Sequence, residues 1–185
     1  MAKPTPEQLL QLEGFRNIAS QVLFGLGIVN SNMLASIDLI PLTVLKRSAT
    51  IRHGSTKWKV GMPVYGTPDE VGEISLHPEL LETSWRSYGV WVMYHELIHA
   101  CGYIRHDKDF RKIESCWPDK TSKGLGKYFT TYLRSKKYEW NWTCHSCNTV
   151  YLRQRRSNGR YACRNCKKTL VDVHRIPQNS STISL

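Results

Sequence analysis

The segment Trp91-Val92-Met93-Tyr94-His95-Glu96-Leu97-Ile98-His99-Ala100 lies within an apolar, aromatic run that spans about residues 84–104. Its composition and spacing predict a largely buried helix. Side chains four residues apart share one face of a helix, so His95 and His99 can point at one metal ion. Two histidines and a glutamate on a buried face are unfavourable unless they bind something. The pattern indicates a metal site; histidines satisfied within the core are the alternative.

Glu96 follows the first histidine directly and would stand beside the metal. There its carboxylate could take a proton from water, because zinc lowers the pKa of a bound water to about 7. The H-E-x-x-H pattern is typical of zinc hydrolases that cleave peptide bonds. We therefore expect a catalytic zinc with Glu96 as general base.

A catalytic zinc needs three protein ligands and one open position. The best candidate for the third ligand is His106, because a turn at Gly102 can fold the chain back onto the helix. Weaker candidates are Glu114, Asp107 and Asp109. The metzincin pattern fails, since its third histidine would fall on Arg105 and no methionine follows Met93.

A second metal signal lies near the C-terminus, where fifteen residues separate two Cys-x-x-Cys pairs. This spacing is typical of a structural four-thiolate zinc site, with the ligands Cys144, Cys147, Cys163 and Cys166. Two zinc ions per chain are therefore expected. We expect His145 to be exposed, and the remaining Cys101 and Cys116 to be buried thiols.

The residues around these cysteines are basic and aromatic. The stretch from Lys137 to Arg175 carries an excess of seven positive charges within a chain of net charge +11, which points to a polyanion such as nucleic acid. A strand near 150–155 and a turn at Asn158-Gly159 would present rings and guanidinium groups to unpaired bases and phosphates. The candidate DNA-binding residues are Trp140, Trp142, Tyr151, Arg153, Arg155, Arg156, Arg160 and Tyr161. We expect one of the two tryptophans to pack the ribbon core instead.

The rest of the chain predicts a mixed architecture. A Thr5–Gln8 capping box opens a helix over 6–24, and strands are predicted at 43–52, 57–65 and 71–77. A hinge at 118–127 precedes a short helix over 127–136. The longest apolar stretch is too short to span a bilayer, and the N-terminus lacks the apolar region of a secretory signal.

Together these motifs resemble the SprT/Spartan family of metalloproteases, over Leu76 to about Asp172. The resemblance rests on Ser75-Leu76-His77-Pro78-Glu79-Leu80-Leu81, on His95–Ala100, on His106 with Phe110, and on Tyr161-x-Cys163-Arg164-Asn165-Cys166. It implies that His106 is the third ligand, although Asp107 replaces the family's glycine. It also implies a DNA-activated endopeptidase that degrades proteins crosslinked to DNA and senses single strands through its ribbon.

We accordingly expect an α+β fold: a zincin-like protease domain at 1–126, a helix plus zinc ribbon at 127–175, and a mobile tail at 176–185. A protein substrate would lie along an edge strand, expected at 71–77. The expected protein is a cytoplasmic, nucleoid-associated monomer (nuclear if eukaryotic) without membrane contact. The alternatives are an inactive DNA-binding ribbon protein and a metallopeptidase without a nucleic-acid role.

Overall fold

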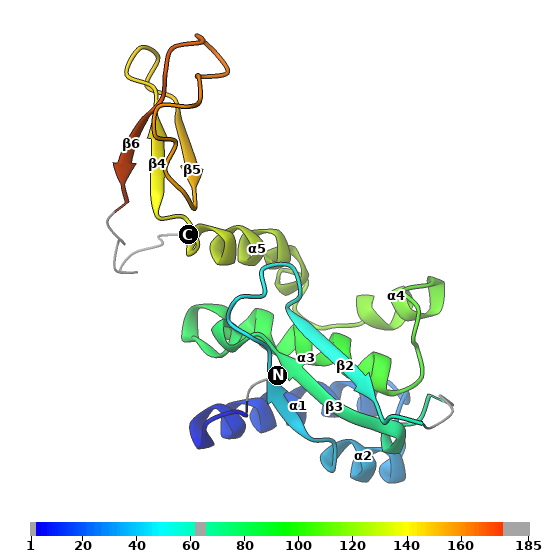
Figure 1. Cartoon of the computed structure of the whole chain (residues 1–185). Helices are drawn as coiled ribbons and strands as arrows, with labels where there is room; N and C mark the ends of the chain where they lie inside the picture. The colour runs from blue at the N-terminus through cyan, green and yellow to red at the C-terminus, as the bar shows by residue number, and fades with distance from the viewer. Residues whose placement is uncertain (1–2, 62–65, 176–185) are drawn as a thin grey trace. The chain divides into compact units, whose positions relative to one another are not determined.

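The computed structural model describes residues 3–61 and 66–175. It is a mixed α+β structure, as expected, with two compact units, Met1–Thr130 and Thr131–Leu185. Each unit is described by itself below (Figure 1). The predicted tail at 176–185 lies outside the described residues. No helix in the described ranges is long and apolar enough to cross a membrane.

The first unit begins with helix α1, Pro6–Gly25, which forms where the sequence predicts it. The predicted capping box is present: Gln8 N donates to Thr5 Oγ1 at 3.2 Å, and Thr5 N donates to Gln8 Oε1 at 3.0 Å. The buried stripe of α1 recurs at helical spacing, with Leu12, Phe15, Ala19 and Leu23. This stripe packs against helix α3, which carries the histidines.

A three-stranded sheet packs against α3 through β2 and β3, and against α1 through β1. Its strands are β1 (Leu42–Val44), β2 (Gly54–Trp58) and β3 (Val71–Leu76), in the order β1-β3-β2. β1 pairs with β3 in parallel, whereas β2 pairs with β3 in antiparallel fashion.

Two of the three predicted strands have the wrong bounds. The strand predicted at 43–52 is too long, because β1 and β2 lie on opposite sides of β3 and the chain uses 45–53 to cross between them. The strand predicted at 57–65 in fact spans Gly54–Trp58, and residues 62–65 lie outside the described part. β3 is found close to its predicted place at 71–77, but it is the central strand, so the edge beside the histidines belongs to β2.

Helix α3, Arg86–Ala100, is the buried centre of the first unit. The 3₁₀ turns η1 (Pro68–Glu70), η2 (Pro78–Leu81) and η3 (Thr83–Trp85) precede it along the chain. α3 ends earlier than the predicted residue 104, because the chain reverses at Gly102, whose φ is +98°. A Cβ there would lie 2.6 Å from the Gly66 carbonyl oxygen, so only glycine fits the turn.

Three further helices complete the unit. α2 (Ser31–Asp38), capped by Asn30, and α4 (Lys108–Ser115), capped by Asp107, were not predicted. After η4 (Ser122–Gly124), α5 spans Leu125–Ser135, close to its predicted range. The domain boundary predicted after residue 126 therefore falls inside a helix. Buried Phe129 holds the first half of α5 in the first unit, with its ring against those of His53, Trp85 and Tyr88.

The second unit is a small antiparallel sheet of β4 (Trp140–Thr143), β5 (Val150–Arg153) and β6 (Val171–His174), in the order β5-β4-β6. Its buried cluster consists of Cys144, Cys163 and Leu170. Asn158 and Gly159 both have positive φ, as predicted for the turn. This turn lies in the loop between β5 and β6 rather than in a two-strand hairpin.

Candidate metal centre

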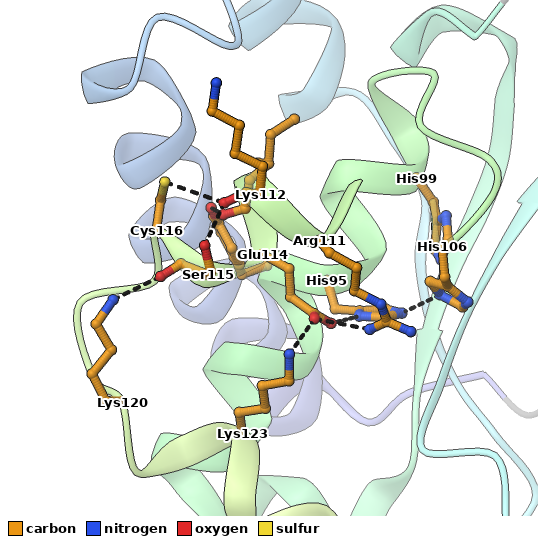
Figure 2. A network of polar contacts seen from close by, with 12 residues as sticks. His95, His99, His106, Arg111, Lys112, Glu114, Ser115, Cys116, Lys120 and Lys123 are labelled. Atoms are coloured by element: carbon orange, nitrogen blue, oxygen red, sulfur yellow. Dashed lines mark hydrogen bonds and ion pairs between the residues drawn. The ribbon is translucent and has the colours of Figure 1, made fainter. Parts of the chain in front are cut away.

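The structure brings His95, His99 and His106 together at the C-terminal end of α3. His95 and His99 point from one face of the helix, and the turn at Gly102 returns the chain so that His106 meets them (Figure 2). The Nε2 atom of His106 lies 3.1 Å from that of His99 and 3.1 Å from that of His95. Three imidazole nitrogens thus converge on one point, as ligands of a single ion must.

The opposite nitrogens of the two helical histidines are engaged in hydrogen bonds. His95 Nδ1 lies 2.9 Å from Glu114 Oε1, and His99 Nδ1 lies 2.8 Å from the carbonyl oxygen of Tyr103. Both partners only accept, so each Nδ1 carries the proton and each Nε2 lone pair is free for a metal. Burial lowers the pKa of His95 to about 4 and also lowers the pKa of His99, so both rings are in the neutral form that binds metal.

Glu114 is therefore a hydrogen-bond partner of His95 and is not among the three converging groups. Its buried carboxylate accepts hydrogen bonds from His95, from Arg111 at 2.9 Å and from Lys123 at 2.6 Å (Figure 2). Burial by itself would raise the pKa of Glu114, but the donors, Lys123 foremost, hold that pKa at about 2. Asp107 caps α4 by accepting from Phe110 N at 3.0 Å, and Asp109 lies in the first turn of α4.

The three histidines fit a zinc ion of the catalytic type. Three imidazoles without a carboxylate among them would leave one position of a tetrahedral ion open. The buried Phe110 ring backs all three, with ring centroids 4.7–4.9 Å away, and so holds their orientation. Metal ligands that are fixed before binding lose little freedom when the ion arrives.

Glu96 lines the same cavity of about 470 Å³ as the three histidines. Its carboxylate Oε2 accepts a hydrogen bond from Thr56 Oγ1 at 2.8 Å. A Cβ on Gly54 would come within 2.6 Å of Glu96 Oε1, so β2 can approach α3 only with glycine at this position. Burial raises the pKa of Glu96 to about 7, against the opposing effects of Thr56 and Arg52. A carboxyl group tuned in this way can both take up and release a proton near neutrality.

Thr56 and Gly54 also contact Glu96, although no motif in the sequence marks them. They lie forty and more residues before Glu96, and only the antiparallel pairing of β2 with β3 brings them to α3. Tyr103 and Arg105 follow the motif closely in sequence, but they are not among the residues that line the cavity. The lining does include one positively charged side chain, that of Arg52.

The four cysteines form the second cluster, which can hold a metal ion such as zinc. Their sulfur atoms lie within 4.8 Å of one another; Cys144 and Cys166, for example, are 3.3 Å apart. Each Cys-x-x-Cys turn is followed by a residue with positive φ, Asn148 in the first and Lys167 in the second. His145 is exposed, as expected. Cys116 is also exposed and Cys101 half-buried, so the expectation of two buried thiols was wrong.

Most of the candidate DNA-binding residues lie on one face of the second sheet. In the pairing of β4 with β5, Trp140 stands opposite Arg153, and Trp142 stands opposite Tyr151, so these four side chains share a face. Trp142 and Tyr161 stack with centroids 4.6 Å apart, and the Arg156 guanidinium lies 4.3 Å from the Trp140 ring centre. A hollow of about 720 Å³ is lined here by Trp142, Arg153, Arg155, Arg156, Arg160 and Tyr161, among others.

Two of the aromatic residues that were predicted to bind DNA also contact the cysteine cluster. Trp142 packs against it, as expected for one of the tryptophans, while its ring still lines the hollow. The Tyr151 hydroxyl lies 3.4 Å from Cys163 Sγ and accepts from Arg164 N at 3.1 Å. Tyr151 and Trp140 are not among the residues that line the hollow.

The chain matches no protein-family model, no curated protein and no solved structure. Any assignment of function therefore depends on the geometry of the two clusters.

The first test of the histidine site is the replacement His106→Ala. It should remove one of two bound zinc ions and leave the ribbon folded, because the cysteine cluster shares no residue with the histidines. Metal analysis and amide spectra of β4–β6 measure the two outcomes. The matched control is His145→Ala, at an exposed histidine outside both clusters, which should keep two ions. Two ions in the His106→Ala protein would rule out His106 as a ligand.

The second test concerns the partner of the first ligand. Glu114→Ala removes the acceptor that fixes the His95 ring, and such losses typically weaken metal affinity about 10–100-fold. Competition with a chelator measures the change. The control Asp109→Ala lies on the same helix, at an exposed position outside the metal group, and should leave the affinity unchanged. An unchanged affinity in Glu114→Ala would show that the hydrogen bond from His95 to Glu114 does not contribute to metal binding.

Proposed function

We propose that this chain is a zinc metalloendopeptidase that cleaves proteins bound or crosslinked to DNA and is activated by single-stranded DNA. The observation that carries the peptidase assignment is the convergence of three histidine Nε2 atoms in one cavity with the buried carboxylate of Glu96. The first unit, which carries these residues, would be a zincin-like domain. The resemblance to SprT/Spartan proteases, which rests on the motifs alone, supports the choice of substrate.

The proposed reaction divides the chemistry between the ion and the chain. Zinc, when bound by the three imidazoles, acts as a Lewis acid that lowers the pKa of water and polarises a carbonyl. Glu96 takes the proton of the attacking water and returns it to the leaving amine. Thr56 holds the carboxylate in place by its hydrogen bond, and burial keeps the pKa of Glu96 near that task.

The protein substrate would bind along β2. This strand is the edge of the sheet beside α3, and it lines the cavity through Gly54, Ser55, Thr56 and Trp58. An extended peptide can add to such an edge through main-chain hydrogen bonds, which hold its backbone regardless of sequence. This corrects the expectation that 71–77 would take the substrate.

The second unit would recognise nucleic acid. Stacked and partly exposed rings beside guanidinium groups suit unpaired bases and their phosphates, whereas the faces of paired bases are hidden. The exposed ring of Tyr161, stacked on Trp142, offers the outer surface for a base. Duplex should therefore bind and activate less well than single strands.

The test is cleavage of a DNA-binding protein with and without single-stranded DNA, by the wild type and by a triple variant. Replacing Arg153, Arg155 and Arg156 by alanine should weaken DNA binding and lower its salt dependence by a slope of about 2, since each single-strand phosphate contact contributes about 0.7. Cleavage at limiting DNA should fall in parallel. The matched control removes three exposed cations from the first unit, Lys108, Lys112 and Lys120, and should bind DNA as the wild type does.

The outcomes also separate the alternatives. DNA binding without any cleavage would favour an inactive ribbon protein, and cleavage without DNA dependence would favour a peptidase without a nucleic-acid role. If the triple arginine variant binds and cleaves like the wild type, the ribbon is not the DNA sensor.

A further inference from the structure

Arg52 is the only lysine or arginine among the described residues that line the catalytic cavity. It stands two residues before β2, the strand proposed to hold the substrate, and its side chain is exposed. Burial raises the pKa of Glu96, and the charge of Arg52 is one of the effects that oppose this rise. The guanidinium is therefore close enough to influence what binds beside the metal ligands.

The segment around Arg52 has a surplus of positive charge. Residues 39–68 contain five lysines and arginines and no aspartate or glutamate. Arg47 and Lys57 form ion pairs with carboxylates of other elements, at 2.6 and 3.0 Å. Within the described part of the chain, Arg52 forms no ion pair with a carboxylate. Its guanidinium thus keeps its donors for a ligand.

A guanidinium that stands alone in a cavity suits a carboxylate better than a nucleic-acid backbone. The planar fork of arginine donates two parallel hydrogen bonds to one carboxylate. A phosphate backbone repeats its charge at every nucleotide and is held by several cations together, as the arginines of the second unit would hold it. The cavity provides one cation, so its anionic ligand should be a single acidic side chain.

The course of β2 decides which part of a substrate reaches Arg52. Contacts along β2 and α3 advance together, because Gly54 approaches Val92 and Thr56 bonds Glu96. β2 therefore runs in the same direction as α3. A peptide paired antiparallel to β2, the more stable pairing, runs the opposite way, so its C-terminal part lies beside Arg52.

We propose that Arg52 is a specificity-determining residue that binds an aspartate or glutamate side chain on the C-terminal side of the scissile bond. Arg52 lies four residues before Thr56, which contacts the general base, and paired strands advance residue by residue. The acidic side chain should therefore fall within about four residues after the scissile bond. This inference rests on the proposed peptidase function and adds a charge preference to it.

The test uses the full-length zinc-loaded protein at saturating single-stranded DNA. Peptides carry aspartate, alanine or lysine in turn at each of the first four positions after the scissile bond, and mass spectrometry assigns the cleavage sites. At one of these positions, aspartate should give a kcat/KM about three- to fivefold above alanine, and lysine should fall below alanine, because an exposed ion pair contributes a factor of this order. Equal values at all four positions, or an acidic preference only before the scissile bond, would overturn the proposal.

Charge reversal ties the preference to this side chain. Arg52→Glu changes an exposed residue, so the fold is not at risk, and lysine should then exceed aspartate. A general loss of activity would not invert this order. The matched control is Lys46→Glu, which makes the same change of net charge at an exposed residue that borders an adjoining hollow with Arg52 but does not line the catalytic cavity. It should keep the wild-type order. An unchanged order in Arg52→Glu, or an equal inversion in Lys46→Glu, would remove Arg52 from this role.

DNA binding decides between the two kinds of anion. Arg52→Glu should leave the affinity for single-stranded DNA within about twofold of the wild type, because no phosphate contact is lost. If the variant instead loses as much DNA affinity as the triple arginine variant of the second unit, and its peptide order is unchanged, Arg52 binds a phosphate and the proposal fails.

A binding measurement separates this inference from the peptidase function. Zinc-loaded Glu96→Gln protein should bind a peptide with aspartate at all four positions about tenfold more tightly than one with lysine there, since attraction and repulsion both contribute. Adding Arg52→Glu should reverse the difference. If the wild type cleaves no peptide but this reversal is found, the role of Arg52 stands and the peptidase proposal fails. Equal binding of both peptides would remove the role of Arg52, whatever the wild type cleaves.

Discussion

Glu96→Gln should abolish peptide cleavage while both metal clusters remain loaded. The amide is nearly isosteric and can still accept from Thr56 Oγ1, but it cannot take a proton from water at neutral pH. A positioned acid–base group typically contributes about 10²–10⁴-fold to a rate, so kcat should fall within that range or below detection. Single-turnover cleavage at saturating single-stranded DNA measures the effect on chemistry alone.

Stability provides an independent readout for the same variant. Burial raises the pKa of Glu96 to about 7, so ionisation of Glu96 costs folding free energy as the pH rises from its ordinary value of 4.5 through 7. Glutamine cannot ionise, and the metal-free variant should therefore melt no lower than the metal-free wild type at pH 8. The control Glu82→Gln, at an exposed carboxylate outside the cavity, should retain wild-type kcat. Activity of Glu96→Gln near the wild-type rate would eliminate Glu96 as the base.

Cys144→Ser should unfold the second unit. Among its described residues, the ribbon has Cys144, Cys163 and Leu170 as its buried cluster, which is too little apolar surface to fold without help. Structural zinc sites supply about 10–16 kcal/mol in comparable small modules, so losing one thiolate should cost the metal, the β4–β6 sheet and the affinity for DNA together. Metal analysis, amide dispersion and DNA anisotropy report the three losses separately.

The chain offers a matched cysteine for comparison. Cys116 is exposed and lies outside the cluster, so Cys116→Ser should keep both metals and full DNA affinity. The histidine site should keep its ion in both variants. Dispersed ribbon amides in Cys144→Ser, with DNA affinity within about twofold of the wild type, would show that the sheet folds without its four-thiolate site.

The predictions from the sequence were most accurate where the residues of a site lie close together along the chain. His95, His99 and His106 lie within twelve residues, and their helical spacing with one glycine turn was enough to group them. The cysteine spacing predicted the second cluster in the same way. Glu114 could be named as a candidate, but its role could not, since only α4 packed against α3 shows that it accepts from His95 rather than facing the ion.

Other features depend on pairing that no local pattern reveals. The strand predicted at 43–52 failed because its apolar and β-branched residues suit a strand, whereas the crossing around β3 requires a loop there. Helix α4 was missed because only Phe110, Ile113 and Glu114 of its eight residues are buried. The edge strand was misassigned because the order β1-β3-β2 is a property of the assembled sheet.

The distribution of these contacts along the chain has a consequence for folding. All three histidines, the Glu114 carboxylate, Arg111 and Lys123 come from the single span of residues 95–123, so the ligand group closes through short loops. Thr56 and Gly54 reach Glu96 only after a much longer loop has closed, and contacts of that separation form more slowly. When the full-length chain refolds, the histidine group can therefore form before the sheet docks, and the complete constellation around Glu96 arises only with the finished tertiary structure.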